Sequence, residues 1–141
     1  MEQQLQQDVL RAVTGAFEAL AIASGPELEQ RVRSLSWVLS PATILHARTG
    51  DDELLSRTRE ALTTFVASGF SRHDQALPLL ASFRELPPFC EAFEYLRAVG
   101  SLDVDTESRA RAIIAASADS HLGSTDWGAH NRATVDAAGF Y

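Results

Sequence analysis

The sequence predicts an all-α protein built from antiparallel helical hairpins. Apolar residues recur at helical spacing through most of the chain, and Gly or Pro punctuates the segments between them. No segment alternates apolar and polar residues over five or more positions with β-branched enrichment, so we expect no strands. With 141 residues, of which 45% are hydrophobic, residues 1–141 can form a single domain with a sizeable core.

Two helices are predicted on either side of Gly25-Pro26, because proline suits the first turn of a helix and ends the one before it. The apolar residues of the first helix share one face: Leu5, Val9, Val13, Phe17 and Leu20. Those of the second do the same: Leu28, Val32, Leu35 and Leu39. We expect Trp37 to be a core anchor of this helix. Ser40-Pro41 has the pattern of a cap followed by a proline and predicts a separate short helix over 42–48.

Gly50 ends that short helix, and Asp51 or Asp52 caps the next one, which ends at Gly69. Its inward residues are predicted from their spacing: Leu55, Leu62, Phe65 and Val66. The segment 70–88 is ambiguous, because its apolar residues can share a helical face while Pro78 limits where such a helix begins.

The second half of the chain repeats this arrangement. Pro87-Pro88 starts a helix that ends at Gly100, and Asp105 or Thr106 caps the following helix. Their inward residues are Phe89, Phe93, Leu96 and Val99, then Ala110, Ile113, Ile114 and Ala118. A closing helix is predicted over 127–138. The stretches 42–65 and 89–116 therefore share one pattern of helix, turn with Gly, acidic cap and helix, as stacked helical hairpins do.

The charge balance argues against several function classes. The net charge is −7 and all 12 basic residues are Arg, scattered along the chain, so neither nucleic-acid binding nor a membrane-surface role is expected. Cys90, the one cysteine, lies in an apolar run and is expected to be a buried, inert thiol. Asp119, His121, Asp126 and His130 match no zinc spacing, so no metal or other cofactor is expected. No signal peptide is visible, so the chain reads as cytoplasmic, although a longer parent could be exported.

The closing stretch 124–141 holds the candidate site. It gathers Trp127, His130, Asn131 and Arg132 within six positions. A neutral amide beside a group able to transfer protons suits acid–base chemistry. Each residue also has a structural interpretation: Asn131 can cap locally, His130 can bond to neighbours four positions away, Arg132 can pair with Asp136, and Trp127 can anchor the core.

Three segments resemble one family. HARTGDDELLSRTREAL is similar to the hairpin turn of α/α-toroid carbohydrate-active proteins. EAFEYLRAVGSLDVDTESRARAIIAASAD resembles the hairpin that precedes the active-site strip of alginate lyases and heparinase II/III-type lyases. DWGAHNRATVDAAGF resembles the segment in which those lyases place an Asn with a His. The resemblance covers about the second two-thirds of the chain and implies a partial α/α toroid.

The resemblance implies a polysaccharide lyase that cleaves uronate-containing glycans by β-elimination, with an acidic polysaccharide as its partner. It assigns Asn131 and His130 as catalytic residues, the amide donating to the substrate carboxylate so that the enolate-like charge is stabilised. Arg132 would contact substrate anions and Trp127 would stack on a sugar. The family has the Asn before the His, whereas this chain has His130 first, and Tyr141 matches no family base.

We therefore expect the chain to be the N-terminal part of a longer toroid and to be inactive when isolated. The alternative is a non-catalytic helical-hairpin domain that binds a partner or oligomerises. An incomplete toroid would leave an apolar helix face exposed, through which the chain could self-associate.

Overall fold

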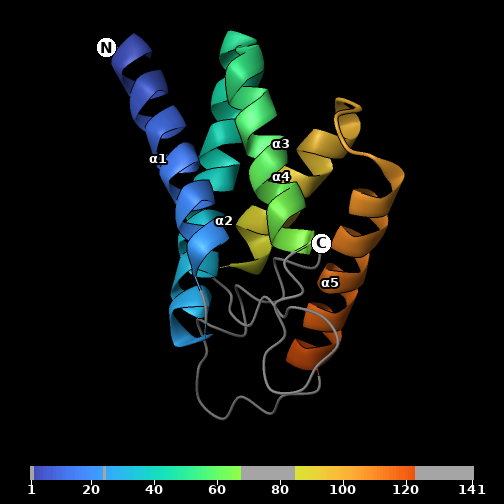
Figure 1. The fold of residues 1–141 in the computed structure, drawn as a ribbon. Coiled ribbons are helices and arrows are strands. Elements are labelled where there is room, and N and C mark those ends of the chain that lie inside the picture. Colours follow the sequence, from blue (N-terminus) through green and yellow to red (C-terminus); the bar gives the residue numbers. More distant parts are fainter. Residues whose placement is uncertain (1, 24, 68–84, 123–141) are drawn as a thin grey trace.

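The described part of the chain is all-helical, as the sequence predicts. The computed structural model describes residues 2–23, 25–67 and 85–122, and these contain five helices and no strand. In chain order the helices are α1 (Glu2–Ile22), α2 (Gly25–Thr49), α3 (Asp52–Ala67), α4 (Leu86–Ala98) and α5 (Val104–Leu122). Figure 1 shows that successive helices run in opposite directions: α1, α3 and α5 descend in that view, and α2 and α4 ascend.

The two central helices, α2 and α3, organise the packing. Helix α2 contacts α1, α3 and α4, whereas α3 contacts α1, α2 and α5, and α4 also packs on α5. The ring of Phe65 on α3 meets the ring of Phe89 on α4 edge-on, with centroids 5.2 Å apart, and both side chains are buried. This pair joins the α2–α3 half of the core to the α4–α5 half.

The core contains most of the residues that helical spacing placed inward. The large buried apolar side chains are Val13, Leu35, Leu39, Leu45, Leu54, Leu62, Phe65, Val66, Leu86, Phe89, Phe93, Leu96 and Ile113. The side chains of Leu20, Leu28 and Val32 lie outside the described part. Leu5 and Val99, both predicted to point inward, are exposed. Leu5 is the fourth residue of α1, and Val99 follows the last residue of α4.

The turn between α2 and α3 follows the predicted pattern. Gly50 has a φ of 67°, in the left-handed region that favours glycine, and its N–H donates to the His46 carbonyl at 2.8 Å. The Asp51 carboxylate then caps α3, since its Oδ1 accepts from the backbone N–H of Glu53 at 3.0 Å and of Leu54 at 3.1 Å. Of the two caps left open by the sequence, Asp51 is the one used.

The turn between α4 and α5 also combines a glycine of positive φ with an acidic cap on the next helix. Gly100 has a φ of 69°, and the N–H groups of Gly100 and Ser101 donate to the carbonyls of Arg97 and Leu96, as in a Schellman motif. Asp103 caps α5 by accepting from the Thr106 N–H at 2.8 Å and from the Thr106 hydroxyl at 2.7 Å. The predicted cap at Asp105 or Thr106 was therefore wrong by two or three residues.

Helix α2 runs without interruption through Ser40-Pro41, so the predicted separate helix over 42–48 was wrong. The Ser40 hydroxyl does not cap a new helix but donates to Glu91 Oε2 on α4 at 2.5 Å. Pro41 is exposed. The backbone bond that Pro41 cannot make, to the carbonyl of Trp37, thus lies on the solvent side, where water can replace it.

Trp37 is not the core anchor that the sequence analysis expected, because its side chain is 58% exposed. The cause is helical phase. Residues two positions apart lie about 200° apart around a helix, so Trp37, two positions from both Leu35 and Leu39, faces away from both. Leu35 and Leu39 are buried, and Trp37 consequently points to solvent.

Candidate functional site

The site residues predicted from the sequence fall beyond the described part of the chain. Trp127, His130, Asn131 and Arg132 all belong to the segment 123–141, so their placement stays a prediction. Within the described ranges, no group of three or more His, Cys, Asp or Glu side chains is placed to hold a metal ion. No helix in those ranges combines the length and apolar character needed to cross a bilayer.

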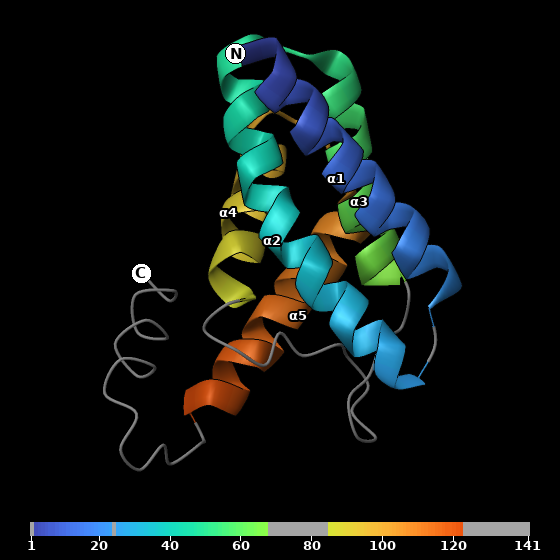
Figure 2. The same ribbon diagram turned by 90° about the vertical axis from the view of Figure 1, so that its left-hand side faces the viewer.

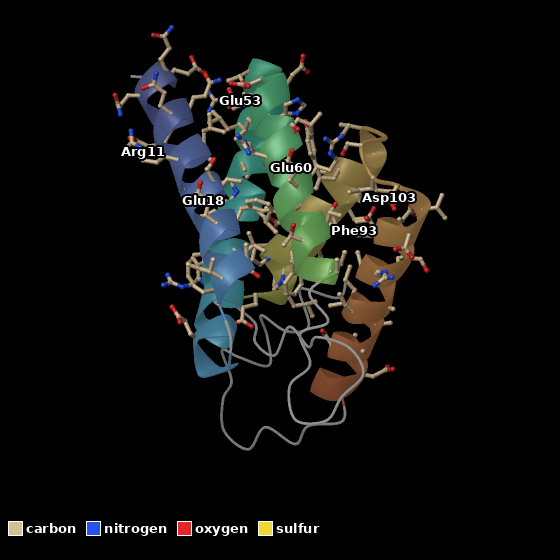
Figure 3. All side chains as sticks on the ribbon, in the orientation of Figure 1. Arg11, Glu18, Glu53, Glu60, Phe93 and Asp103 are labelled. Atoms are coloured by element: carbon tan, nitrogen blue, oxygen red, sulfur yellow. The ribbon has the colours of Figure 1, made fainter. Side chains whose placement is uncertain are left out.

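The described residues instead form an open depression between α1, α3 and the turn that joins α4 to α5. Its volume is about 370 Å³. Seven residues line it: Phe17, Arg59, Glu60, Thr63, Thr64, Ser101 and Asp103. Figure 3 labels Glu60 on α3 and Asp103 just before α5, the two carboxylates that border the depression.

Each wall of the depression is held by local structure. On α3, Thr63 and Thr64 lie three to five positions after Arg59 and Glu60, so these residues share a helix face. On the opposite wall, the Ser101 hydroxyl donates to the Leu96 carbonyl at 3.0 Å. The N–H and hydroxyl of Thr106 lower the pKa of the Asp103 carboxyl, so this group stays ionised at neutral pH.

Arg59 stands out because it has no carboxylate partner in the described part of the chain. Its guanidinium donates to the Ser56 hydroxyl at 3.2 Å. The neighbouring Arg57 pairs instead with Glu60, at 3.4 Å. The other arginines whose side chains are described all form ion pairs: Arg11, Arg31, Arg48, Arg97, Arg109 and Arg111.

Sequence reasoning missed Arg59, although the sequence contains a signal for it. On a helix, ion-pair partners lie three or four positions apart. Arg59 has Leu55, Ser56, Leu62 and Thr63 at these positions, and none of them is acidic. A guanidinium without a helical partner remains available to an external anion.

Polar contacts between α2 and α4 form a second cluster. Nδ1 of His46 lies 2.6 Å from the Tyr95 hydroxyl, and the two rings meet edge-on with centroids 5.7 Å apart. The Ser40–Glu91 hydrogen bond links the same two helices about two turns away along α2. These contacts fix the packing of α4 on α2. They border none of the depression described above, so we assign them a structural role.

Cys90 is half-buried rather than buried as the sequence predicts, and its raised pKa agrees with the predicted inert thiol. Burial raises the pKa of the Cys90 thiol to about 11, with smaller contributions from the charges of Glu94 and Glu91. The nucleophile in thiol chemistry is the thiolate, and at neutral pH almost none is present at this pKa. The half-buried Cys90 is thus a packing residue.

The outward face of α2 carries an apolar stripe. Trp37, Pro41 and Ile44 are all exposed, with Trp37 and Ile44 each at 58%, and their spacing places them on one face of the helix. Figure 2 shows α2 facing the viewer between α1 and α4. The stripe is an apolar helix face that no other described helix covers.

Comparisons of the chain with protein-family models, with curated proteins and with solved structures found no match. The chemical interpretation of the depression and of the stripe therefore rests on the geometry of this chain.

Proposed function

We propose that the chain is the N-terminal part of a polysaccharide-lyase-like protein that acts on uronate-containing glycans by β-elimination. The observation that carries the proposal is the run from Asp126 to Arg132, which follows the second helix–turn–helix unit of the chain. The turns at Gly50 and Gly100, each with an acidic cap on the next helix, support the resemblance to stacked helical hairpins. A larger α/α toroid would continue this stacking.

The proposed chemistry assigns a distinct role to each residue of the run. The proton on C5 of a uronate is weakly acidic while the adjacent carboxylate is ionised. The Asn131 amide, with His130 beside it, would donate hydrogen bonds to that carboxylate and stabilise the charge that develops on it. Arg132 would pair with a substrate anion and Trp127 would stack on a sugar ring.

The test has a catalytic and a binding readout. The chain is incubated with alginate, heparin and hyaluronan while the absorbance of the unsaturated uronate is followed, and binding of the same glycans is measured by calorimetry. Because the base is expected further along a longer parent, we expect little cleavage, but binding that weakens at least about fivefold in Asn131→Ala. Ser124→Ala, in the same segment but outside the run, serves as the control. If no glycan binds, or if both variants bind as the wild type does, the proposal is wrong.

A second function, a non-catalytic interaction domain, is favoured by the exposed stripe of Trp37, Pro41 and Ile44 on α2. A stripe of this kind, uncovered on the outside of a helix, is typical of a docking face for another helix or for a second copy of the chain. Sedimentation velocity tests self-association directly. The second function predicts a concentration-dependent mass that Ile44→Ser abolishes, while Ile22→Ser, at an exposed residue of α1, leaves it unchanged. A monomer at all concentrations would refute self-association.

A further inference from the structure

We infer that the depression between α1, α3 and the α4–α5 turn is a binding subsite for a small polyhydroxylated carboxylate, such as one uronate unit, and that Arg59 is its carboxylate-binding residue. The site is separate from the Asp126–Arg132 run. The inference rests on the proposed function only for the choice of a sugar acid as the ligand. The arrangement of charge, hydroxyl groups and shape on the described helices carries the rest.

Arg59 supplies the positive charge of the depression. Every other arginine with a described side chain forms an ion pair with a carboxylate, whereas the hydrogen-bond partner of Arg59 among the described residues is the Ser56 hydroxyl. That hydroxyl in turn donates to Glu60 Oε1 at 3.4 Å, so Ser56 orients one edge of the guanidinium. The other N–H groups of Arg59 have no hydrogen-bond partner within residues 2–23, 25–67 and 85–122, and they can bind a carboxylate in the bidentate manner that guanidinium favours.

Neither acidic residue of the depression is paired with Arg59 in the described part of the chain. Glu60 is paired with Arg57 at 3.4 Å, and the Asp103 carboxylate accepts two hydrogen bonds from Thr106. Each carboxylate has two oxygens and can accept further hydrogen bonds. They can therefore accept hydrogen bonds from ligand hydroxyls while Arg59 holds the ligand carboxylate.

The remaining lining residues match a sugar ring. Thr63, Thr64 and Ser101 contribute three hydroxyl groups, each able to donate and accept. Phe17 contributes an apolar wall against which the C–H face of a ring can pack. The volume of about 370 Å³ falls at the lower end of the roughly 300–1,000 Å³ typical of small-molecule sites. One sugar unit thus suits the space better than a long oligosaccharide does.

The experiment titrates the ¹⁵N-labelled chain with glucuronate, with its methyl ester and with glucose, and follows amide chemical shifts. The ester presents the same hydroxyls without the charge, and glucose has an uncharged hydroxymethyl group in place of the carboxylate. We expect shifts at residues 59–64 and 101–103, and glucuronate binding about two- to fivefold tighter than the two neutral sugars, as for one exposed guanidinium–carboxylate contact. Arg59→Gln should remove this preference, and Arg59→Lys should restore part of it.

The matched control is Arg109→Gln, which removes the same charge from α5, where Arg109 pairs with Asp105 at 2.8 Å and lines no part of the depression. It should leave the preference for glucuronate intact. Equal affinity for all three sugars, an equal loss in Arg59→Gln and Arg109→Gln, shifts confined to other residues, or no binding at all would each overturn the inference. Asn131→Ala separates the two proposals. Binding that depends on Arg59 but not on Asn131 supports the subsite even if the lyase proposal fails.

Discussion

Replacing Asp51 by Ala should destabilise the protein measurably, whereas replacing the adjacent Asp52 should not. The Asp51 carboxylate accepts from two backbone N–H groups at the start of α3, at 3.0 and 3.1 Å, and a side-chain hydrogen bond from Gln6 ties it to α1. Loss of such a cap costs about 1 kcal/mol, and up to about 2 kcal/mol when further contacts are lost with it. Asp52 is exposed and is the first residue of α3, so its replacement removes only a favourable dipole interaction of about 0.3 kcal/mol.

The assay is urea unfolding followed by circular dichroism at pH 7, together with thermal melts. An unfolding entropy of roughly 2 cal/mol/K per residue converts 1 kcal/mol into a decrease of about 3–4 °C in Tm for a chain of this length. Asp51→Ala should show that decrease, and Asp52→Ala a change of about 1 °C or less. Hydrogen exchange at the Glu53 and Leu54 amides should accelerate in Asp51→Ala only. If Asp52→Ala costs as much as Asp51→Ala, the assignment of the cap is wrong.

Three further predictions concern buried and exposed side chains. Phe89→Ala should lower the free energy of unfolding in urea by about 3–5 kcal/mol, because this ring is fully buried. Trp37→Ala should lower it by about 0.5 kcal/mol or less, because the Trp37 side chain is exposed. Similar losses in the two variants would contradict the assigned phase of α2. Tyr95→Phe should cost about 1 kcal/mol, since His46 loses its hydrogen-bond partner, and no loss would indicate that water replaces the hydroxyl. Cys90 should react with a disulfide reagent about 100-fold more slowly at pH 8 than a thiol of ordinary pKa, with a rate that rises about tenfold per pH unit. A reaction rate that does not depend on pH would contradict the raised pKa of the Cys90 thiol. Because folding raises this pKa from 9.0 to about 11, the stability that the thiol contributes is present below pH 9 and is lost as the pH rises toward 11.

The turns were the most predictable part of the fold, because their signals are local. A glycine followed by an acidic cap is a feature of neighbouring residues, so the turn at Gly50 could be located from the sequence and its cap narrowed to Asp51 or Asp52. Ser40-Pro41 shows the limit of such signals. The same two residues can start a helix or continue one, and the choice depends on whether the serine finds a better partner elsewhere. It does so in Glu91, 51 positions away, a contact that no local pattern contains.

The predicted face of Trp37 was wrong for a reason that the sequence could have supplied. Trp37 was predicted to be buried because it lies near Leu35 and Leu39 in the sequence. The periodicity of the helix nevertheless places Trp37 on a different face from both leucines. The prediction therefore followed the apolar composition of the segment, whereas the helical periodicity gives the correct face. The exposed stripe on α2 follows from the phase, since Trp37, Pro41 and Ile44 recur at intervals of four and three.

Only part of the depression could be predicted from the sequence. Six of the arginine ion pairs join residues three or four positions apart, and helical spacing accounts for them. By the same rule Arg59 has no acidic residue three or four positions away on its helix. Its lack of a helical ion-pair partner can therefore be seen in the sequence once α3 is assigned. Phe17, Ser101 and Asp103 reach the same place from α1 and from the α4–α5 turn, and only the packing of those helices brings them together. A binding site of this kind has one component that depends on local sequence, the unpaired charge. Its other component, the wall of the depression beside that charge, depends on how the helices pack. The variants Arg59→Gln and Arg109→Gln remove the same charge from different places: Arg59 lines the depression without a carboxylate partner in the described ranges, whereas Arg109 is paired with Asp105 and lies outside the lining.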